Sequence, residues 1–475
     1  MAPTDPYALP ADAIQDPPTS LLGAMRKIGP GLILAGSIVG TGELIATTGL
    51  GAEQGYVLLW LILFSCVIKV FVQVELGRYA ITHGKTTLAA LDTLPGPRLG
   101  VSWICWAWLL MMLATQAQIA AMEGLIGQAA HMTFPRVSFA MAGAAGSFHL
   151  ASGAFLESRP EHVWATLTAI AAVVLLLSGG YKRLERITTT LVALVTLITV
   201  ACVLGLSWTD YPLSLKGVVD GLKVTVPTAG VALAFSAFGI TGVGASELFA
   251  YPYWCIEKGY ARSAGPRDDS AGWAMRAKGW MHVMQVDAWF SMLVFTAATI
   301  AFYLLGAAVL HPQGLVPKGS EMLETLSRMY VEPLGPWTRS VFLVGAWAVL
   351  FKTLYVATAA NSRLSADFLD LAGFWRQPDA ASRERTIRAF CVFYPALALG
   401  LYFGLRDPKA LVTLGGYAQG LMLPVIAAAS LYLTRRDRVA SVAEGPFSKL
   451  LSWVAFLSIT AVASYSVYDL LARLR

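Results

Sequence analysis

The sequence predicts an all-α polytopic membrane protein with about eleven transmembrane helices, the first and sixth of which are broken. Three observations support this fold class. Of the 475 residues, 56% are hydrophobic and only 13% are charged, whereas soluble domains carry about 25% charged residues. Apolar windows long enough to cross a bilayer recur along the whole chain. Two of these windows carry matching runs of glycine near their centres.

The composition excludes several classes of protein. With a mean hydropathy of +0.61, a water-soluble globule, a disordered chain and a fibrous chain are all excluded. The formal charge of +6 is spread over short loops, so we expect no nucleic-acid partner. All five cysteines lie in apolar runs without a CxxC pair, which indicates small buried residues. The first 22 residues are rich in Pro and Asp and predict no cleavable signal peptide.

Eleven windows match the roughly 20 apolar residues that span about 30 Å of hydrocarbon. They are residues 28–50, 56–77, 101–130, 163–177, 187–206, 226–256, 281–310, 337–361, 389–405, 411–433 and 450–471. Apart from Lys69 and Lys352, 22 basic residues fall on one side and 11 on the other. This bias predicts an inner-membrane protein with a cytoplasmic N-terminus.

The windows also divide the chain into segments. Residues 1–27 form a cytoplasmic tail, 28–206 a first repeat of five spans, 207–433 a second repeat, and 434–475 the eleventh span with the C-terminus. The loops between spans are too short for a soluble domain, so the function must lie among the helices.

The first and sixth spans share a glycine-rich pattern. The run Ser-Ile-Val-Gly-Thr-Gly-Glu-Leu occupies residues 37–44, and Gly-Ile-Thr-Gly-Val-Gly-Ala-Ser-Glu-Leu occupies residues 239–248. Because each glycine costs a helix interior about 1 kcal/mol relative to alanine, both runs predict local unwinding. Interrupted spans five helices apart fit a five-plus-five inverted repeat with a transporter site at the midplane. The alternative is that the glycines allow close helix packing.

Four segments resemble a known family. Gly-Pro-Gly-Leu-Ile-Leu-Ala at 29–35 and Gly-Tyr-Val-Leu-Leu-Trp at 55–60 resemble the opening of the NRAMP (natural resistance-associated macrophage protein) proton-coupled metal transporters. The similarity continues through Ala-Phe-Tyr-Leu-Leu-Gly at 301–306 and Ala-Thr-Ala-Ala-Asn-Ser at 357–362. The resemblance covers roughly residues 28–433 and implies a LeuT-like inverted repeat, in agreement with the glycine pattern.

The residues at the family's metal site differ here. The family's Asp-Pro-Gly-Asn aligns with residues 40–43, so its metal-binding Asp falls on Gly40. Its Met-Pro-His aligns with residues 246–248, so the soft thioether position becomes Ser246 and the His position becomes Leu248. We therefore expect a divergent member that lacks the usual metal-site residues.

The two broken helices are expected to form a site for a hard cation. Carboxylates, hydroxyls and carbonyls suit Mg²⁺, Ca²⁺ or Mn²⁺, whereas soft ligands select other transition metals. With Glu43 and Glu247 both ionised, the charge of a divalent cation would be neutralised, and the cation could keep several waters, as Mg²⁺ prefers. The expected substrate-binding residues are Gly40, Thr41, Glu43, Gly242, Ser246 and Glu247, and the metal ligands among them are Glu43 and Glu247.

Two lysines inside the spans complicate this hypothesis. Lys69 lies near the middle of the second span and Lys352 near the middle of the eighth. One interpretation is an internal ion pair, with Glu75 or a site glutamate, that fixes helix packing. If the lysines instead neutralise Glu43 and Glu247, a metal loses its reason to bind. The alternative function is then cation-coupled transport of a small polar or zwitterionic organic solute, whose carboxylate the half-helix N-termini would face.

Other polar residues also lie within the spans. The family's third-span Asp falls on Ala120 and its following Glu on Glu123, which is either a buried hydrogen-bonded acid or part of a proton relay. Asp287 is expected to reach water near the cytoplasmic interface. Asn361 and Gln419 are expected to make interhelical hydrogen bonds. The candidates for proton or ion coupling are therefore Glu43, Glu123, Glu247, Lys69 and Lys352.

The sequence supports an enzyme or a channel less well than a transporter. None of the six histidines forms an HExxH pair and no GxSxG motif with partners occurs, so neither an enzyme nor a bound cofactor is expected. A channel would need a filter-like repeat, which is absent from the sequence. We therefore expect a secondary active transporter in the lipid bilayer. Its expected partners are an inorganic, hard divalent cation or a small solute, with protons as the coupling ion.

Overall fold

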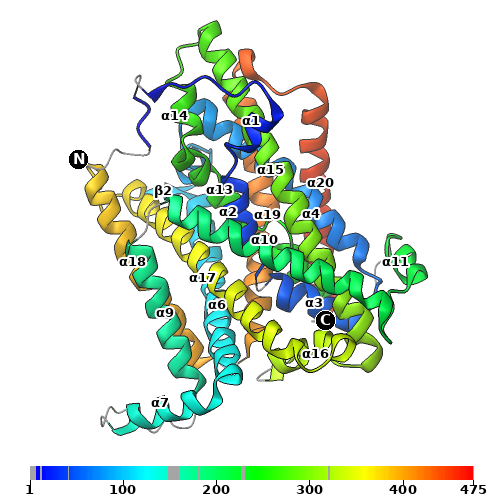
Figure 1. Ribbon diagram of the computed structural model, residues 1–475. Helices are drawn as coiled ribbons and strands as arrows, with labels where there is room; N and C mark the ends of the chain where they lie inside the picture. The colour runs from blue at the N-terminus through cyan, green and yellow to red at the C-terminus, as the bar shows by residue number, and fades with distance from the viewer. Residues whose placement is uncertain are drawn as a thin grey trace.

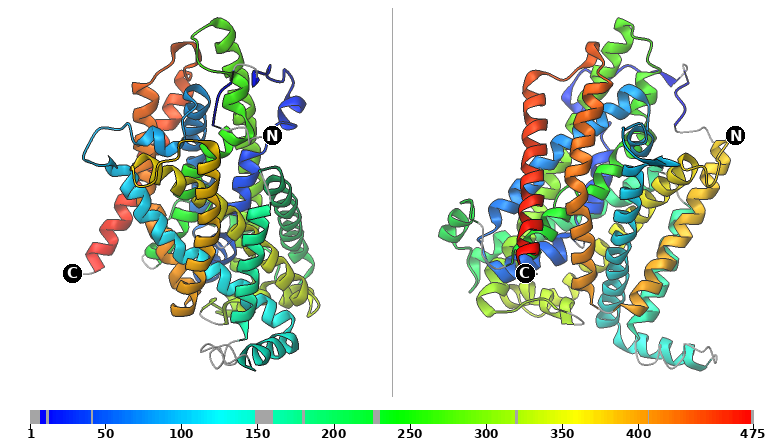
Figure 2. Two further views of the ribbon diagram at one scale, coloured as in Figure 1. Left: turned by 90° about the vertical axis from the view of Figure 1, so that its left-hand side faces the viewer. Right: turned by 180° about the vertical axis from the view of Figure 1, so that it is seen from behind.

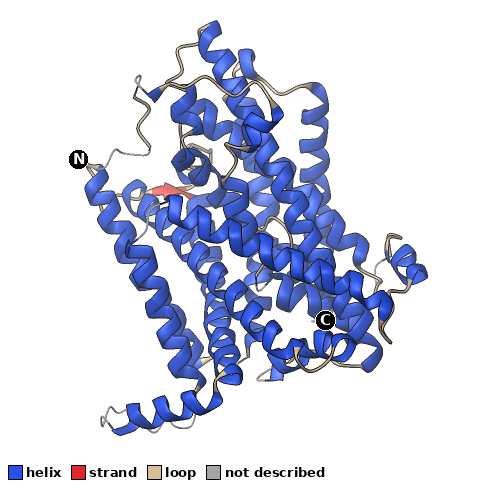
Figure 3. Ribbon diagram, viewed as in Figure 1, coloured by secondary structure: helices blue, strands red, loops and turns tan. Residues whose placement is uncertain are grey.

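The computed structural model describes residues 7–10, 13–40, 42–147, 160–178, 181–225, 230–318, 321–405 and 407–473. This part of the chain is helical almost throughout, with one small antiparallel hairpin (Figures 1 and 3). The hairpin pairs β1 (Arg98–Leu99) with β2 (Val101–Ser102) and turns at Gly100, whose φ of +74° suits glycine. The all-α prediction is confirmed.

Nine long helices form most of the bundle. They are α4 (Leu59–His83), α6 (Trp103–Thr133), α9 (Glu161–Ser178), α10 (Tyr181–Gly205), α15 (Ala271–Leu305), α17 (Thr338–Leu371), α18 (Ala380–Gly404), α19 (Pro408–Arg436) and α20 (Pro446–Arg473). Two further spans are assembled from shorter helices. These are α2 (Pro30–Ile38) with the π-helical η2 (Gly42–Thr47) and α3 (Thr48–Gln54), and α12 (Val231–Ile240) with α13 (Ala245–Lys258).

The remaining elements are short and connect or flank the spans. They are α1 (Leu21–Met25), α5 (Thr87–Leu91), α7 (Pro135–Ser147), η3 (Leu206–Trp208), α11 (Leu215–Gly221), α14 (Tyr260–Ala264), η4 (Gly306–Leu310), η5 (His311–Gln313), α16 (Met322–Leu334) and η7 (Ala440–Val442). The 13-residue α16 has no counterpart among the predicted windows, because it is too short to span a membrane.

Each of the eleven predicted windows falls on a helix or a helix pair. Within the described residues, nine helices are long and apolar enough to cross a membrane, or ten if the bent pair of α2 with η2–α3 is counted as one span. In the region of α10, the described apolar helical stretch is residues 196–208, which is shorter than a span. The number eleven therefore stays a prediction.

Two long helices extend beyond their hydropathy windows. The helix α15 begins at residue 271, ten residues before the predicted 281, and α17 ends at 371, ten residues after the predicted 361. With 35 residues, α15 is about 50 Å long, well above the hydrocarbon thickness of about 30 Å. A hydropathy window stops at charged residues, whereas the helical hydrogen bonds continue until a cap ends them. Here Ser270 caps α15 by accepting a hydrogen bond from the amide of Trp273.

The helices divide into central and peripheral ones. In the most apolar 18-residue stretch of each helix, 72% of the residues are buried in α4 and 78% in α12–α13, but only 28% in α9 and in α20. The helices α9 and α18 pack together on one flank, and α20 runs along the opposite flank (Figures 1 and 2). Peripheral helices that are apolar and largely unburied within the protein are typical of contact with lipid.

Helical geometry stops within both glycine runs. The helix α2 ends at Ile38 and η2 begins at Gly42, and the two segments meet at 42°. The helix α12 ends at Ile240 and α13 begins at Ala245, with Gly242 between them at a φ of +67°. A positive φ excludes Gly242 from a right-handed helix, so the chain direction changes there at low steric cost.

Candidate functional site

A cavity of about 60 Å³ lies next to the interruption in the sixth span. Its walls come from α2, α6, α13, α17 and α19, together with Gly42 and Ile240. Its polar lining includes Ser37, Gln118, Ser246, Glu247, Asn361 and Gln419. Among the described lining residues, Glu247 is the only charged one and Met122 is the only one with sulfur. The cavity is therefore lined mostly by oxygen and carbon atoms, with one carboxylate.

Glu247 joins two of the walls. Its Oε1 accepts a hydrogen bond of 2.6 Å from the hydroxyl of Ser37, which connects α13 to α2. The side chain is partly buried and lines the cavity. Glu247 lies in the first turn of α13, near the free amides of the helix N-terminus, where a negative charge is favoured. Sequence reasoning did not select Ser37, although it begins the glycine run of the first span.

A chain of amide contacts fixes the opposite wall. The backbone N–H of Ser246 donates to Oε1 of Gln419 at 3.1 Å, and Nε2 of Gln419 donates to Oε1 of Gln118 at 2.9 Å. The interhelical hydrogen bond predicted for Gln419 is confirmed, with α6 as the partner helix. The corresponding prediction for Asn361 is wrong within the described chain, because Asn361 lines the cavity and makes no such bond there.

Glu43 lies in different surroundings from Glu247. It is fully buried in η2 and does not line the cavity. Its Oε1 accepts a hydrogen bond of 2.9 Å from Thr299 of α15, and its Oε2 has no hydrogen-bond partner among the described residues. The structure thus brings Gly42, Ser246 and Glu247 to one cavity and leaves Glu43 outside its walls. Thr41 lies outside the described residues.

The remaining glycines of the predicted site serve packing as well as bending. A Cβ on Gly40 would collide with the side chain of Thr353, and one on Gly242 would lie 2.9 Å from Cα of Cys66. A Cβ on Gly239 would collide with the carbonyl oxygen of Gly416. Close helix packing, the alternative reading of the glycine runs, therefore accompanies the interruption in both spans.

The two buried lysines bind main-chain carbonyls. Nζ of Lys69 donates to the carbonyl oxygens of Phe238 at 2.5 Å and Thr241 at 2.6 Å, at the C-terminal end of α12. Nζ of Lys352 donates to the carbonyl oxygen of Val39 at 2.7 Å, directly after α2. Both side chains are fully buried. Each ammonium group thus satisfies carbonyls that a helix C-terminus leaves free, where a positive charge is favoured.

The predicted internal ion pair of these lysines is wrong. Neither Lys69 nor Lys352 forms a salt bridge with any carboxylate in the described chain, and Glu75 pairs with Arg78 at 3.2 Å instead. The sequence places the lysines at mid-span, but it does not show which main-chain groups are left without partners by the interruptions.

Asp287 does not reach water, contrary to the prediction. It is fully buried, and its Oδ1 accepts a hydrogen bond of 2.8 Å from the amide of Gly29. Its Oδ2 accepts hydrogen bonds from the amide of Gly31 at 2.6 Å and from the hydroxyl of Tyr251 at 3.1 Å. Asp287 therefore caps the N-terminus of α2 from a different helix, because the free amides there provide a better environment for the carboxylate than an apolar one.

Glu123 is buried without a partner. Both of its carboxylate oxygens lack a hydrogen bond within the described residues. The predicted hydrogen-bonded acid is thus not found, and the proton relay stays a prediction. A buried carboxylate in such a position is stable only when it is protonated or binds a cation.

Comparisons with known proteins agree with this architecture. A family model described as "Natural resistance-associated macrophage protein-like" matches residues 31–469. The divalent metal cation transporter MntH of Brucella suis biovar 1 (strain 1330) is 20% identical over 459 residues, which cover 94% of this chain and 87% of that protein.

Two solved structures have similar folds. A manganese transporter from Eremococcus coleocola aligns with a TM-score of 0.61 at 16% identity, covering 96% of this chain and 89% of that one. Mhp1, a nucleobase-cation-symport-1 family transporter, aligns with a TM-score of 0.56 at 13% identity, covering 94% and 91%.

The family match and the apolar helices define a multi-pass membrane transporter, and the similar solved structures show that its fold is LeuT-like. The chain belongs to the natural resistance-associated macrophage protein (NRAMP) family. The predicted family and fold class are thus confirmed.

Proposed function

We propose that this chain is a secondary active transporter of a hard divalent cation, which passes through the cavity beside Glu247 and is coupled to protons. The observation that carries the proposal is the carboxylate of Glu247, held by Ser37 against a cavity at the interrupted sixth span. We further propose an inner-membrane location with the N-terminus in the cytoplasm, from the distribution of basic residues.

The chemistry of the cavity favours a hard cation. Hydroxyl, amide and carboxylate oxygens are the ligands that Mg²⁺, Ca²⁺ and Mn²⁺ prefer, and the thioether of Met122 is the one soft group among the described lining residues. No group of three or more His, Cys, Asp or Glu side chains that could hold a metal ion occurs in the part of the chain that the structure describes. The cation would therefore keep several of its waters, as Mg²⁺ commonly does. MntH and the Eremococcus coleocola protein, described as divalent metal and manganese transporters, support the same substrate class.

The lysines favour protons over sodium as the coupling ion. In transporters with broken helices, carbonyls at half-helix C-termini can coordinate Na⁺. Here the ammonium groups of Lys69 and Lys352 already bind such carbonyls in both interrupted spans. Glu43 and Glu123 are buried carboxylates with unpartnered oxygens within the described chain, and they are the candidates for carrying the proton.

The test is uptake of Mn²⁺ and Mg²⁺ into proteoliposomes, with and without an inward proton gradient. Glu247→Gln should abolish uptake, because it removes the carboxylate that faces the cavity. Glu43→Gln should retain metal binding but lose the response to the gradient. Glu324→Gln, which removes an exposed ion pair with Arg339, is the matched control and should transport normally. Normal uptake by both Glu247→Gln and Glu43→Gln would contradict the proposal.

The same assay tests the coupling ion. Wild-type uptake should not change when Na⁺ is replaced by choline, since the ammonium groups of Lys69 and Lys352 already bind the carbonyl oxygens that could coordinate Na⁺. Lys352→Gln should reduce uptake strongly, whereas Lys352→Arg, which keeps the charge, should retain more of it. Stimulation of the wild-type protein by Na⁺ would contradict proton coupling.

One observation favours a second candidate, a polar or zwitterionic organic solute. Lys69, Lys352 and Glu43 are buried and Glu247 is partly buried, so the charges of these four groups can balance without a metal. Absence of Mn²⁺ and Mg²⁺ uptake by a folded, monodisperse wild-type protein would favour this candidate. The cavity of about 60 Å³ suits a small ion better than an organic molecule.

A further inference from the structure

A second cavity, of about 310 Å³, has a basic lining and shares no lining residue with the cavity beside Glu247. It is formed by the end of α4, the C-terminal end of α19, the segment around η7 and the beginning of α20. Four cationic side chains line it, namely Arg78, Arg435, Arg438 and Lys449, beside the aromatic ring of Trp453.

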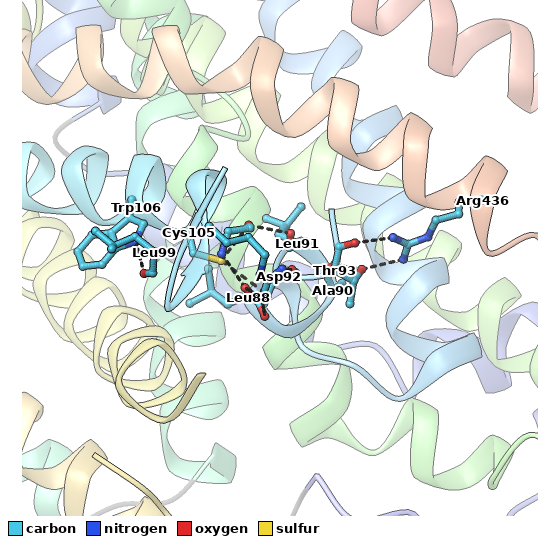
Figure 4. Close-up of polar contacts among 11 residues, drawn as sticks. Leu88, Ala90, Leu91, Asp92, Thr93, Leu99, Cys105, Trp106 and Arg436 are labelled. Atoms are coloured by element: carbon cyan, nitrogen blue, oxygen red, sulfur yellow. Dashed lines mark hydrogen bonds and ion pairs between the residues drawn. The ribbon is translucent and has the colours of Figure 1, made fainter. Parts of the chain in front are cut away.

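The neighbouring Arg436 is already engaged elsewhere. Its guanidinium pairs with Asp437 at 2.6 Å. It also donates to the carbonyl oxygen and the hydroxyl of Thr93, both at 2.7 Å (Figure 4). The hydrogen bonds from Arg436 lower the pKa of Asp437 to about 2, so this carboxylate stays ionised beside it. Arg436 and Asp437 thus neutralise each other outside the cavity.

Most of the lining cations have no such partner. Arg438 and Lys449 contact no carboxylate within the described residues, and the guanidinium of Arg435 lies 4.6 Å from the ring centroid of Trp453. Only Arg78 is paired, with Glu75 at 3.2 Å.

One acid belongs to the cavity. Glu444 lines it, and its buried Oε2 has no hydrogen-bond partner in the described chain. The three cations without carboxylate partners therefore outnumber the acid, and the cavity attracts anions.

We propose that this cavity binds the phosphate of an anionic phospholipid. Guanidinium groups bind phosphate through paired hydrogen bonds, and an ammonium group adds a point charge. Basic pockets between transmembrane helices are suited to lipid headgroups of this kind. Trp453 fits the same setting, because tryptophan favours the headgroup level of a bilayer.

The adjoining surface of α20 favours a lipid over free phosphate. Phe447, Leu450, Val454 and Leu457 recur at helical spacing and are between 41% and 72% exposed. They follow one side of α20, next to the side that carries Lys449 and Trp453. A phosphate held in the cavity would thus place its acyl chains along this apolar stripe. Figure 2 shows α20 on the outside of the bundle, where lipid has access.

Binding of dioleoyl phosphatidylglycerol and dioleoyl phosphatidylcholine to the purified full-length protein in detergent tests the proposal, with native mass spectrometry as the readout. Phosphatidylglycerol should bind more tightly than the zwitterionic lipid. Arg438→Gln and Lys449→Gln should each weaken that binding about fivefold. Glu444→Gln should strengthen it, because it removes the one like charge in the cavity. Lys278→Gln, at an exposed lysine of α15, is the matched control and should leave binding unchanged.

Two results would overturn the proposal. The first is equal binding of the two lipids, or binding of phosphatidylglycerol that none of the cavity variants alters. The second is binding of inorganic phosphate at millimolar concentration, measured by equilibrium dialysis with radiolabelled phosphate, if that binding depends on Arg438 and Lys449 and the protein shows no preference for the lipid. That result would assign the cavity to a free anion. A destabilised variant would lose lipid binding, so tighter binding by Glu444→Gln would show that the cavity of this variant is folded.

Discussion

At the scale of single residues, Glu43 and Glu247 follow the two glycine runs with the same Glu-Leu dipeptide but have different neighbours. Glu247 contacts Ser37 and lines the cavity, whereas Glu43 is enclosed beside Thr299. Identical local sequence therefore does not produce identical sites. Glu247 lies in the first turn of a regular α-helix, whereas Glu43 lies in the π-helical η2.

Asp287 shows how main-chain amides, together with one tyrosine hydroxyl, can stabilise a buried charge. Its two oxygens accept hydrogen bonds from the amides of Gly29 and Gly31. The carboxylate thus provides acceptors for amides that have no hydrogen-bond partner within α2. From the sequence, an aspartate near a span end is more readily interpreted as reaching water.

Asp287→Ala should destabilise the protein. The substitution leaves two buried amides without acceptors, at about 1–3 kcal/mol for each. Thermal unfolding in detergent would show a lowered Tm. Asp220→Ala, which removes only an exposed ion pair with Lys223, is the control and should change stability by less than about 1 kcal/mol. An unchanged Tm for Asp287→Ala would show that water satisfies these amides.

At the scale of elements, α2 is stabilised at both ends by groups from other helices. Asp287 of α15 lies at its N-terminus and Lys352 of α17 lies at its C-terminus. These charges match the two ends of the helix dipole. A nine-residue helix is too short to be stable by itself, so its ends need such partners.

Close approach of α12 and α19 depends on glycine. The Cβ of an alanine at Gly239 would collide with the carbonyl oxygen of Gly416. A backbone atom cannot move away as a flexible side chain could, so the two helices would have to separate.

Gly239→Ala should therefore cost about 1–3 kcal/mol, as overpacking commonly does. The matched control is Gly400→Ala in α18, where a Cβ would meet no atom within 4 Å. Because alanine favours a helix by about 0.5–1 kcal/mol over glycine, this control should be neutral or slightly stabilising. Chemical or thermal unfolding of both variants measures the difference. Equal stability of the two would show that α12 and α19 can separate freely.

At the scale of the whole molecule, a polar network joins the N-terminal segment to three helices at one end of the bundle. The hydroxyl of Tyr7 donates to Oε1 of Glu257 at 3.0 Å, and the same carboxylate pairs with Arg363 at 2.5 Å. The guanidinium of Arg363 in turn lies 4.9 Å from the ring centroid of Trp254, which lines the cavity. The network thus lies beside the part of the cavity wall that Trp254 forms.

A second ion pair closes the same region. Arg383 of α18 pairs with Asp367 of α17 at 2.9 Å, and its guanidinium lies 3.8 Å from the ring centroid of Tyr7. Tyr253 of α13 donates to Asp367 at 2.6 Å. Separation of α13, α17 and α18 at this point would break these contacts, so the network holds the three helices together.

Glu257→Gln should favour opening at this end. A cysteine introduced at Ala360, which lines the cavity, should then react with a charged thiol reagent about tenfold faster, a shift of about 1.4 kcal/mol. Glu324→Gln removes an exposed ion pair elsewhere and should leave the rate unchanged. The parent protein without the introduced cysteine gives the background from its five natural cysteines. An unchanged rate in Glu257→Gln would show that the network does not limit access.

The sequence by itself determined the fold class, the family, the apolar windows that fall on helices, and the two glycine runs. These properties follow from local composition and spacing, since a bilayer demands apolar windows and glycine marks the interruptions. Only the tertiary structure decided the partners of the buried charges. Lys69, Lys352 and Asp287 bind main-chain groups of helices far away in the sequence. No sequence pattern reveals those contacts, because the free amides and carbonyls of a helix end are the same for every residue type.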